Sequence, residues 1–312
     1  MKVCIIGAGD SGAIAALQVR RLDTNAQIDV FSKRAELGRP PCEMPLVLSG
    51  TVAHWEELIR GLRTRPFYEK RSINIHLNTE VTNIFRKQKY VIAKGQRYDY
   101  DKLILALGAT PSLPSLSGLD GKNEFVLSTD MADGVALGNT IPKCDKTAVI
   151  GGSFIGLEIA AALKSRGYRN VYLLARRDIL RAHLDKDMSE ILQSMIKEKG
   201  VELITHARIE NIRSQGEGKR VILTERELKV DFVFFATGAE PNVELAQKAS
   251  LRIGETGAIA VNQYLQTSDP DIYAIGDCME NWDVITGSKR KNSTGNQCHP
   301  HRLHSRPEHH PE

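Results

Sequence analysis

One cysteine of the chain has neighbours that suit redox chemistry. Cys42 is followed by Glu43, Met44 and Pro45, and proline suits the first turn of a helix. A thiol close to a helix N-terminus is more easily ionised, and the thiolate is the form that attacks a disulfide or a peroxide. We therefore predict that Cys42 is the catalytic, redox-active residue. The alternative is a buried, inert cysteine, which is the usual state of a free thiol.

The remaining cysteines have no such setting. They form no C-x-x-C pair and no zinc-like spacing, so we predict free thiols, a reducing compartment and no metal site. Cys4 lies inside an apolar strand pattern, and Cys278 directly follows a Gly-Asp pair near the C-terminal end. We expect core or surface positions without redox function for these residues, which are Cys4, Cys144, Cys278 and Cys298.

Two glycine-rich runs could each hold the pyrophosphate of a dinucleotide. The first is Gly7-Ala8-Gly9-Asp10-Ser11-Gly12, between an apolar strand pattern and a helical pattern. The second is Gly151-Gly152-Ser153-Phe154-Ile155-Gly156, in the same context. Such glycines permit a tight turn and let the backbone approach the phosphates, whose charge then lies at a helix N-terminus. Two such units in one chain predict two bound dinucleotides.

Three further segments have the form of strands that end beside a cofactor. Residues 103–109 and 232–239 are near-duplicate apolar runs, ending in Ala106-Leu107-Gly108 and in Ala236-Thr237-Gly238. A third strand pattern ends in Gly276-Asp277. Small residues at these positions allow the chain to cross close to a bound group.

The acidic residue that usually contacts the adenosine ribose is missing from both predicted sites. The first strand–turn–helix unit leads instead to Ser32, Lys33 and Arg34, and the second to Arg176 and Arg177. A hydroxyl could substitute weakly in the first. Two guanidinium groups in the second fit the additional phosphate of NADPH, so we expect NADPH rather than NADH. The alternative is that both arginines only belong to a solvated strand end.

Length and composition set wide limits on the class of protein. The 312 residues suggest about two domains, and 41% hydrophobic with 26% charged residues is ordinary for a soluble globular protein. No apolar run approaches the roughly 20 residues that span a bilayer, so we expect a cytoplasmic protein without a membrane partner. The net charge is +4, but lysine and arginine are scattered along the chain, which argues against a nucleic-acid partner.

The ordered set of these motifs resembles the FAD-dependent pyridine nucleotide-disulfide oxidoreductases, over residues 1 to about 285. The resemblance implies an α/β fold with two Rossmann-like domains, the NAD(P)-binding one inserted into the FAD-binding one. The implied boundaries are 1–112 and 237–287 for the FAD-binding domain, 113–236 for the NAD(P)-binding domain, and 288–312 for an atypical tail. For FAD the implied contacts are Gly7, Gly9, Ser11, Gly12, Ser32, Lys33, Arg34, Val81, Ala106, Gly108, Gly276 and Asp277. For NADPH or NADH they are Gly151, Gly152, Phe154, Ile155, Gly156, Glu158, Arg176, Arg177 and Gly238.

The run that begins at Cys42 resembles the single-cysteine branch of this family, which contains coenzyme A-disulfide reductases, NADH oxidases and NADH peroxidases. Within that branch, Gln18 and Arg21 resemble coenzyme A contacts, and Arg71 replaces a family lysine. The implied substrate is a small-molecule disulfide or persulfide such as coenzyme A disulfide. Peroxide or oxygen is the second choice. A third possibility is a redox-sensing protein or a truncated fragment with little turnover. Alternatively, these residues bind no substrate, and the basic ones only belong to a solvated helix face.

The last residues differ in composition from the rest. From about Lys289 onward the chain is rich in histidine and proline and has almost no apolar residues. Family members continue here into a helix and a dimerisation domain, so we expect the C-terminal domain to be missing and the family homodimer to be doubtful. Shifting the reading frame permits a small-residue helix, which suggests a frameshift near residues 288 to 297. The other interpretations are a disordered tail or metal-binding histidines.

Overall fold

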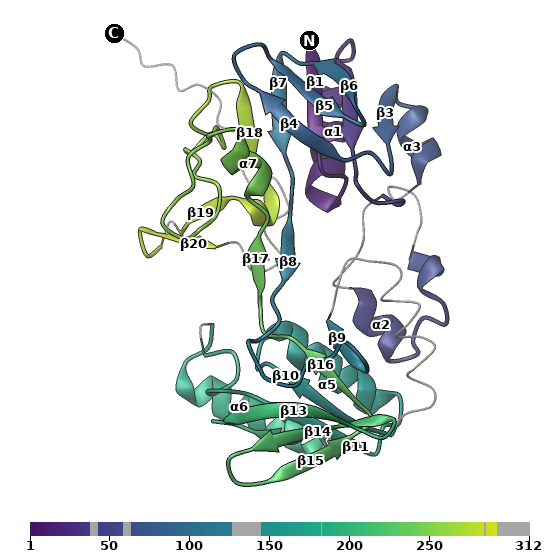
Figure 1. The fold of residues 1–312 in the computed structure, drawn as a ribbon, viewed down its shortest axis with the longest axis vertical. Coiled ribbons are helices and arrows are strands. Elements are labelled where there is room, and N and C mark those ends of the chain that lie inside the picture. The colour runs from purple at the N-terminus through teal and green to yellow at the C-terminus, as the bar shows by residue number, and fades with distance from the viewer. Residues whose placement is uncertain (38–42, 59–63, 127–144, 182, 284, 292–312) are drawn as a thin grey trace. The chain divides into compact units, whose positions relative to one another are not determined.

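The computed structural model describes residues 1–37, 43–58, 64–126, 145–181, 183–283 and 285–291 (Figure 1). The chain forms two compact units. The first consists of Met1–Arg39, Ile59–Thr110 and Pro241–Glu312, and the second of Pro40–Leu58 and Pro111–Glu240. Cys42 and the tail from residue 292 lie outside the described residues.

A five-stranded parallel sheet forms the centre of the first unit. Its order is β18-β7-β1-β2-β3. A three-stranded antiparallel sheet of β4, β5 and β6 accompanies it. The strands are β1 (Lys2–Ile6), β2 (Gln27–Phe31), β3 (Ile73–His76), β4 (Val81–Phe85), β5 (Tyr90–Ala93), β6 (Gln96–Asp99), β7 (Lys102–Leu105) and β18 (Ile272–Ala274). Its other elements are α1 (Asp10–Leu22), α3 (Arg65–Glu69), α7 (Glu244–Lys248), η5 (Gly276–Cys278) and the hairpin β19 (Glu280–Asp283)–β20 (Ser288–Lys291).

The second unit repeats this plan. Its parallel sheet has the order β12-β11-β10-β16-β9, and β13, β14 and β15 form the antiparallel sheet. The strands are β9 (Glu124–Val126), β10 (Lys146–Ile150), β11 (Asn170–Leu174), β12 (Glu202–Ile204), β13 (Ile209–Gln215), β14 (Gly218–Leu223), β15 (Glu227–Val230) and β16 (Phe232–Phe235). Its helices are α2 (Met44–Leu48), η2 (Trp55–Leu58), α5 (Phe154–Ser165) and α6 (Lys186–Glu198). In both units the glycine turn therefore follows the central strand of a parallel sheet.

The central strands are almost wholly apolar because both faces of each sheet are covered. In β1, the residues Val3 to Ile6 are buried, and β16 is buried throughout. Their side chains alternate between two core clusters in each unit. The predicted α/β class with two Rossmann-like units is confirmed by this topology.

The chain passes between the units along two short strands, β8 (Ala109–Pro111) and β17 (Ala239–Pro241), which pair with each other. The segment Pro40–Leu58 groups with the second unit. The reason is local packing: Leu48 lies in the core cluster of α5, and Arg166 donates a hydrogen bond to the carbonyl oxygen of Val47 at 3.0 Å.

Candidate functional site

The glycine turn of the first unit is built by backbone contacts that leave no room for side chains. Gly7 has φ +111°, and a Cβ there would overlap the carbonyl oxygen of Ala106 at the end of β7. A Cβ at Gly12 would overlap the carbonyl oxygen of Gly7. At Gly9, by contrast, a Cβ would meet nothing within 4 Å. Gly7 and Gly12 are therefore required by packing, whereas Gly9 faces open space at the start of α1.

The Gly276-Asp277 pair lies at this same turn. Gly276 has φ +71°, and a Cβ there would come within 2.6 Å of the Ser11 Oγ. The adjacent Asp277 has a buried Oδ1 without a hydrogen-bond partner, and burial raises the pKa of its carboxyl group. A buried, unpartnered carboxylate oxygen is costly. Hydroxyl donors of a bound group would satisfy it, so these residues fit the predicted FAD.

The end of β2 carries the residues expected near the adenosine. Ser32 is buried, and its Oγ accepts a hydrogen bond from the Arg34 amide at 3.1 Å. The segment before β4 runs beside it, since the Thr79 amide donates to the Ser32 carbonyl oxygen at 2.7 Å. This pairing places Val81, Ser32 and Arg34 in one region, with Lys33 exposed to solvent. Gly108, at φ +68°, follows the Ala106 strand end.

The second glycine turn has the same contacts with different residues. Gly151 has φ +127°, and a Cβ there would overlap the carbonyl oxygen of Ala236, the counterpart of Ala106. A Cβ at Gly156 would overlap the carbonyl oxygen of Gly151. Gly238 follows the strand end with φ +109°. The structure thus brings together the glycines of the second motif and the second small-residue strand end.

The middle position of the second turn is a serine that the sequence analysis did not single out. Ser153 is the N-cap of α5, as Gly9 is the N-cap of α1. Gly152 instead packs on the loop after β11, where a Cβ would lie 2.9 Å from the Ala175 Cβ. The equivalence of Ser153 and Gly9 could have been read from the sequence. Gly151 and Gly156 have the same spacing as Gly7 and Gly12, so residue 153 takes the position of Gly9 in the motif.

Side chains around the start of α5 are left open to a ligand. Phe154 and Ile155 are adjacent and are 43% and 39% exposed, so they present apolar surface at the start of α5. Arg176 and Arg177 are exposed after β11 and have no partner among the described residues. Partial burial raises the pKa of Glu158 on the first turns of α5. The set fits a phosphorylated dinucleotide.

The predicted substrate residues lie at the C-terminal end of α1. Gln18 and Arg21 are three positions apart on that helix and so share a face. Arg20 donates to the Arg71 carbonyl oxygen at 2.9 Å, which ties Arg71 to this helix end. The Arg71 guanidinium lies 3.7 Å from the centre of the Phe67 ring. Gln18 and Arg21 thus lie on the helix whose C-terminal end is tied to the Arg71 backbone.

The two described cysteines that were predicted to be inert have raised pKa values. Burial, followed by the charges of Asp29 and Asp99, raises the pKa of Cys4 to about 12. Burial raises the pKa of Cys278 to about 11. Neither is a thiolate near neutral pH, so neither suits nucleophilic attack. The helix predicted after Cys42 is present as α2, which begins at Met44 with Pro45 in its first turn.

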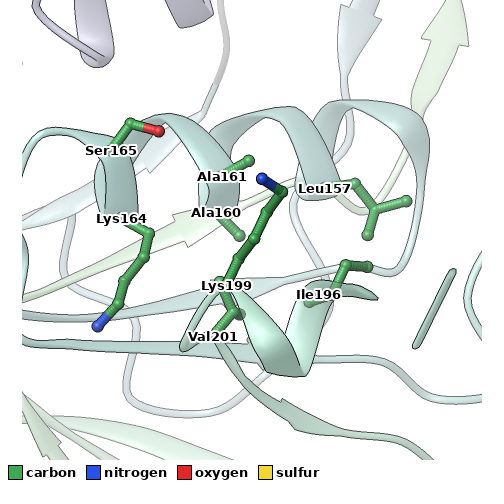
Figure 2. Close-up of a pocket in the computed structure, with 8 residues that line it drawn as sticks. All are labelled: Leu157, Ala160, Ala161, Lys164, Ser165, Ile196, Lys199 and Val201. Atoms are coloured by element: carbon green, nitrogen blue, oxygen red, sulfur yellow. The ribbon is translucent and has the colours of Figure 1, made fainter. Parts of the chain in front are cut away.

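A small cavity of about 170 Å³ lies between α5 and α6, away from these residues. Its floor is apolar, and Figure 2 shows the Lys199 side chain extending across it towards Ala161. Lys164 is engaged elsewhere, since its Nζ donates to the carbonyl oxygen of Arg169 at 2.8 Å. None of the predicted cofactor or substrate residues lines this cavity.

The two parallel sheets each carry a glycine turn with free space or exposed side chains at the start of the following helix. This arrangement defines a protein built around two dinucleotide sites. The chain belongs to the pyridine nucleotide-disulphide oxidoreductase family, whose model matches residues 1–300. Among the described residues, no helix is both long and apolar enough to cross a membrane.

Named relatives lie within the predicted branch. The chain is 37% identical to an NADH oxidase of Methanocaldococcus jannaschii, covering 93% of this chain and 65% of that protein. It is 34% identical to an NAD(P)H coenzyme A polysulfide/persulfide reductase of Pyrococcus horikoshii, covering 92% and 65%. The solved NAD-dependent persulfide reductase of A. fulgidus superposes with a TM-score of 0.90 at 34% identity, covering 96% of this chain and 56% of that one. The chain thus spans about two thirds or less of these relatives' lengths.

The unpartnered carboxylate leads to a prediction about Asp277. Its folded-state pKa is raised, so the stability of the FAD-free protein falls as pH rises above the ordinary aspartate pKa of about 4 and through the folded-state pKa. Asp277→Asn removes that loss. We expect the FAD-free variant to be more stable than the unsubstituted protein at pH 7 and to bind FAD about tenfold more weakly. Denaturant unfolding from pH 4 to 8 and flavin-fluorescence titration measure the two effects.

Asp29 provides a control of opposite sign. Burial opposes its ionisation, but hydrogen bonds from His76, Asn74 and Gln27 outweigh burial and lower the pKa of its carboxyl group. Its contribution to stability is present above the ordinary aspartate pKa and is lost as pH falls through the lowered one. Asp29→Asn should therefore destabilise the protein at pH 7. A stability gain in Asp29→Asn, or none in Asp277→Asn, would contradict this assignment of the two carboxylates.

Proposed function

We propose that the first unit holds FAD and the second unit holds a nicotinamide dinucleotide. The observation that carries this proposal is the duplicated glycine turn, with the buried Asp277 Oδ1 at the first turn and Arg176 and Arg177 beside the second. Solved family members support it, since one is described as an FAD-dependent oxidoreductase of Desulfovibrio vulgaris. The indicated reaction class is electron transfer from a reduced nicotinamide through a flavin.

We propose further that the oxidant is a small disulfide or persulfide, such as coenzyme A disulfide, and that it reacts at Cys42. The names of the Pyrococcus horikoshii and A. fulgidus relatives support a sulfur substrate. Arg21 and Arg71 support an anionic one, because their guanidinium groups could pair with the phosphates of coenzyme A. The neutral amide of Gln18 could add a hydrogen bond.

In this mechanism the Cys42 thiolate attacks one sulfur of the substrate disulfide. A mixed disulfide forms, and the other sulfur leaves as a thiolate that takes up a proton. The bound cofactors supply the two electrons that cleave the mixed disulfide, restoring the Cys42 thiolate and releasing the second thiol. Within the first unit Asp277 would hold the flavin, and within the second unit the turn from Gly151 to Gly156 would hold the nicotinamide dinucleotide.

We favour NADPH as the reductant. Exposed arginines that lack partners at a strand end suit bidentate binding of an additional phosphate. The A. fulgidus protein is described as NAD-dependent and the Pyrococcus horikoshii one as NAD(P)H-dependent, so the relatives do not decide between the two. Steady-state rates with both reductants test the choice, and a strong preference for NADH would contradict it.

Oxygen or peroxide reduction is the second candidate function, and the name of the Methanocaldococcus jannaschii relative favours it. Both candidate functions use the same cofactors. They differ only in the oxidant, which is a disulfide or persulfide in the first and oxygen or peroxide in the second. A cytoplasmic location is part of the proposal.

An anaerobic titration tests the proposed function. The purified protein should be yellow, and NADPH should bleach the flavin absorbance. Adding coenzyme A disulfide or a persulfide in the absence of oxygen should restore the flavin absorbance at least as fast as the enzyme turns over in steady state. Rapid reoxidation by air, with no effect of the disulfide, would favour the oxidase. A colourless protein, or one that neither NADPH nor NADH bleaches, would contradict both functions.

A further inference from the structure

The two glycine turns share their first and last glycines and differ in the residues between them, including the N-cap residue of the following helix. Gly7 and Gly151 each lie against the carbonyl oxygen of an alanine at a strand end, and Gly12 and Gly156 each lie against the carbonyl oxygen of the first glycine. The N-cap residue between them is Gly9 in the first unit and Ser153 in the second. The two turns therefore have the same backbone contacts at their outer glycines and different N-cap side chains.

Packing of the protein does not require glycine at residue 9. Gly9 has φ −69° and ψ −179°, which any residue adopts, and a Cβ there would meet nothing within 4 Å. Ser153 has nearly the same backbone, with φ −86° and ψ 172°. The missing side chain at residue 9 thus leaves space outside the protein, where the pyrophosphate of a dinucleotide approaches the turn.

The Ser153 side chain changes the amide donors at the start of α5. Its Oγ accepts a hydrogen bond from the Gly156 amide at 3.3 Å and donates one to the Ala236 carbonyl oxygen at 3.0 Å. The N-cap of α1 makes no such side-chain hydrogen bond. Free amides at a helix N-terminus are the groups that bind phosphate oxygens. The second turn therefore offers one amide fewer than the first, and it carries an additional Cβ.

We propose that Ser153 weakens the binding of the dinucleotide pyrophosphate in the second unit, compared with a glycine at the same position. The inference deepens the proposed function, because it takes the second unit as the nicotinamide site. In the first turn, Gly9 has no side chain that could accept a hydrogen bond from the Gly12 amide. Ser153 is thus a residue that sets affinity through the turn, and Arg176 and Arg177 contribute affinity at the other end of the nucleotide.

Two substitutions separate the parts of this effect. Ser153→Gly removes both the hydroxyl and the Cβ, and glycine is tolerated at an N-cap. Ser153→Ala removes the hydroxyl alone. We expect Ser153→Gly to bind NADP⁺ about fivefold more tightly than the unsubstituted protein, because one amide is released to the ligand and the Cβ is removed. Ser153→Ala releases the amide but keeps the Cβ, so it should show a smaller gain. Calorimetric titration of NADP⁺ into the oxidised protein gives the dissociation constants, and stopped-flow displacement gives the dissociation rates.

The reciprocal substitution tests the same idea in the first unit. Gly9→Ser should be accommodated without clash and should raise the dissociation constant of FAD about fivefold. Unchanged or weaker NADP⁺ binding by Ser153→Gly, or unchanged FAD binding by Gly9→Ser, would overturn the proposal. Failure of the unsubstituted protein to bind NADP⁺ or NAD⁺ would instead overturn the assignment of the second unit, and the FAD arm would still decide the role of the N-cap side chain.

Discussion

Cys42→Ser is expected to reduce turnover of coenzyme A disulfide or a persulfide by at least about a thousandfold, the size of loss that follows removal of a nucleophile. A serine hydroxyl stays protonated near neutral pH and cannot store electrons as a thiolate does. Bleaching of the flavin by NADPH should remain, because that step does not use the thiol. Anaerobic rapid-mixing spectroscopy separates the two half-reactions in one experiment.

The two buried cysteines supply matched controls. Cys4 and Cys278 have pKa values raised to about 12 and about 11, so neither can replace Cys42 as a nucleophile. Cys4→Ala and Cys278→Ala should keep disulfide turnover within a fewfold of the unsubstituted protein, with some loss of stability from the truncated core side chains. Disulfide turnover that survives in Cys42→Ser would remove this residue from the mechanism. Loss of flavin bleaching in the same variant would show a disturbed fold instead.

The glycine turns and the strands before them were predictable from the sequence. An apolar run, a glycine turn and a helical pattern follow one another in a fixed order, and the physical reasons for that order are local. This order of patterns correctly predicts the positions of four turn glycines, which are Gly7, Gly12, Gly151 and Gly156. The strand ends at Ala106 and Ala236 followed from the same reasoning, because only small residues fit beside such a turn. Family membership, predicted from the combination, is confirmed by the match to residues 1–300.

Other features depend on contacts between residues distant in sequence. Arg20 belongs to the same basic run as Arg21, but its guanidinium donates to the backbone carbonyl oxygens of Arg71, Asp23, Thr24, Ala26 and Ser72. It is therefore a structural residue, and composition does not distinguish it from Arg21. The grouping of residues 40–58 with the second unit depends on Leu48 and Arg166, which are 118 residues apart. Neither side chain carries a local signal for that contact.

Substituting Gly12 in the first glycine turn is expected to cause a large loss of both stability and FAD binding. Gly12→Ala should destabilise the first unit by about 2 kcal/mol or more and abolish FAD retention, because the new Cβ overlaps the carbonyl oxygen of Gly7. The positions of the new Cβ and of the Gly7 carbonyl oxygen are both fixed by the backbone, so no change of rotamer relieves the overlap. The start of α1 would have to move away from β1 instead. The helix propensity gained by alanine, about 1 kcal/mol, does not offset this. Denaturant unfolding of the FAD-free protein and the flavin absorbance of the purified variant measure the two losses.

Gly9→Ala is the matched control at the same helix start. A Cβ at Gly9 meets nothing within 4 Å, so the FAD-free variant should unfold within about 0.5 kcal/mol of the unsubstituted protein, as surface substitutions do. FAD binding should still weaken, because the methyl group occupies the space that the pyrophosphate needs. The contrast separates a glycine needed by the fold from one needed by the ligand. Equal destabilisation by the two substitutions would mean that Gly9 also packs against the protein, and the open approach to the turn would then have to be sought elsewhere.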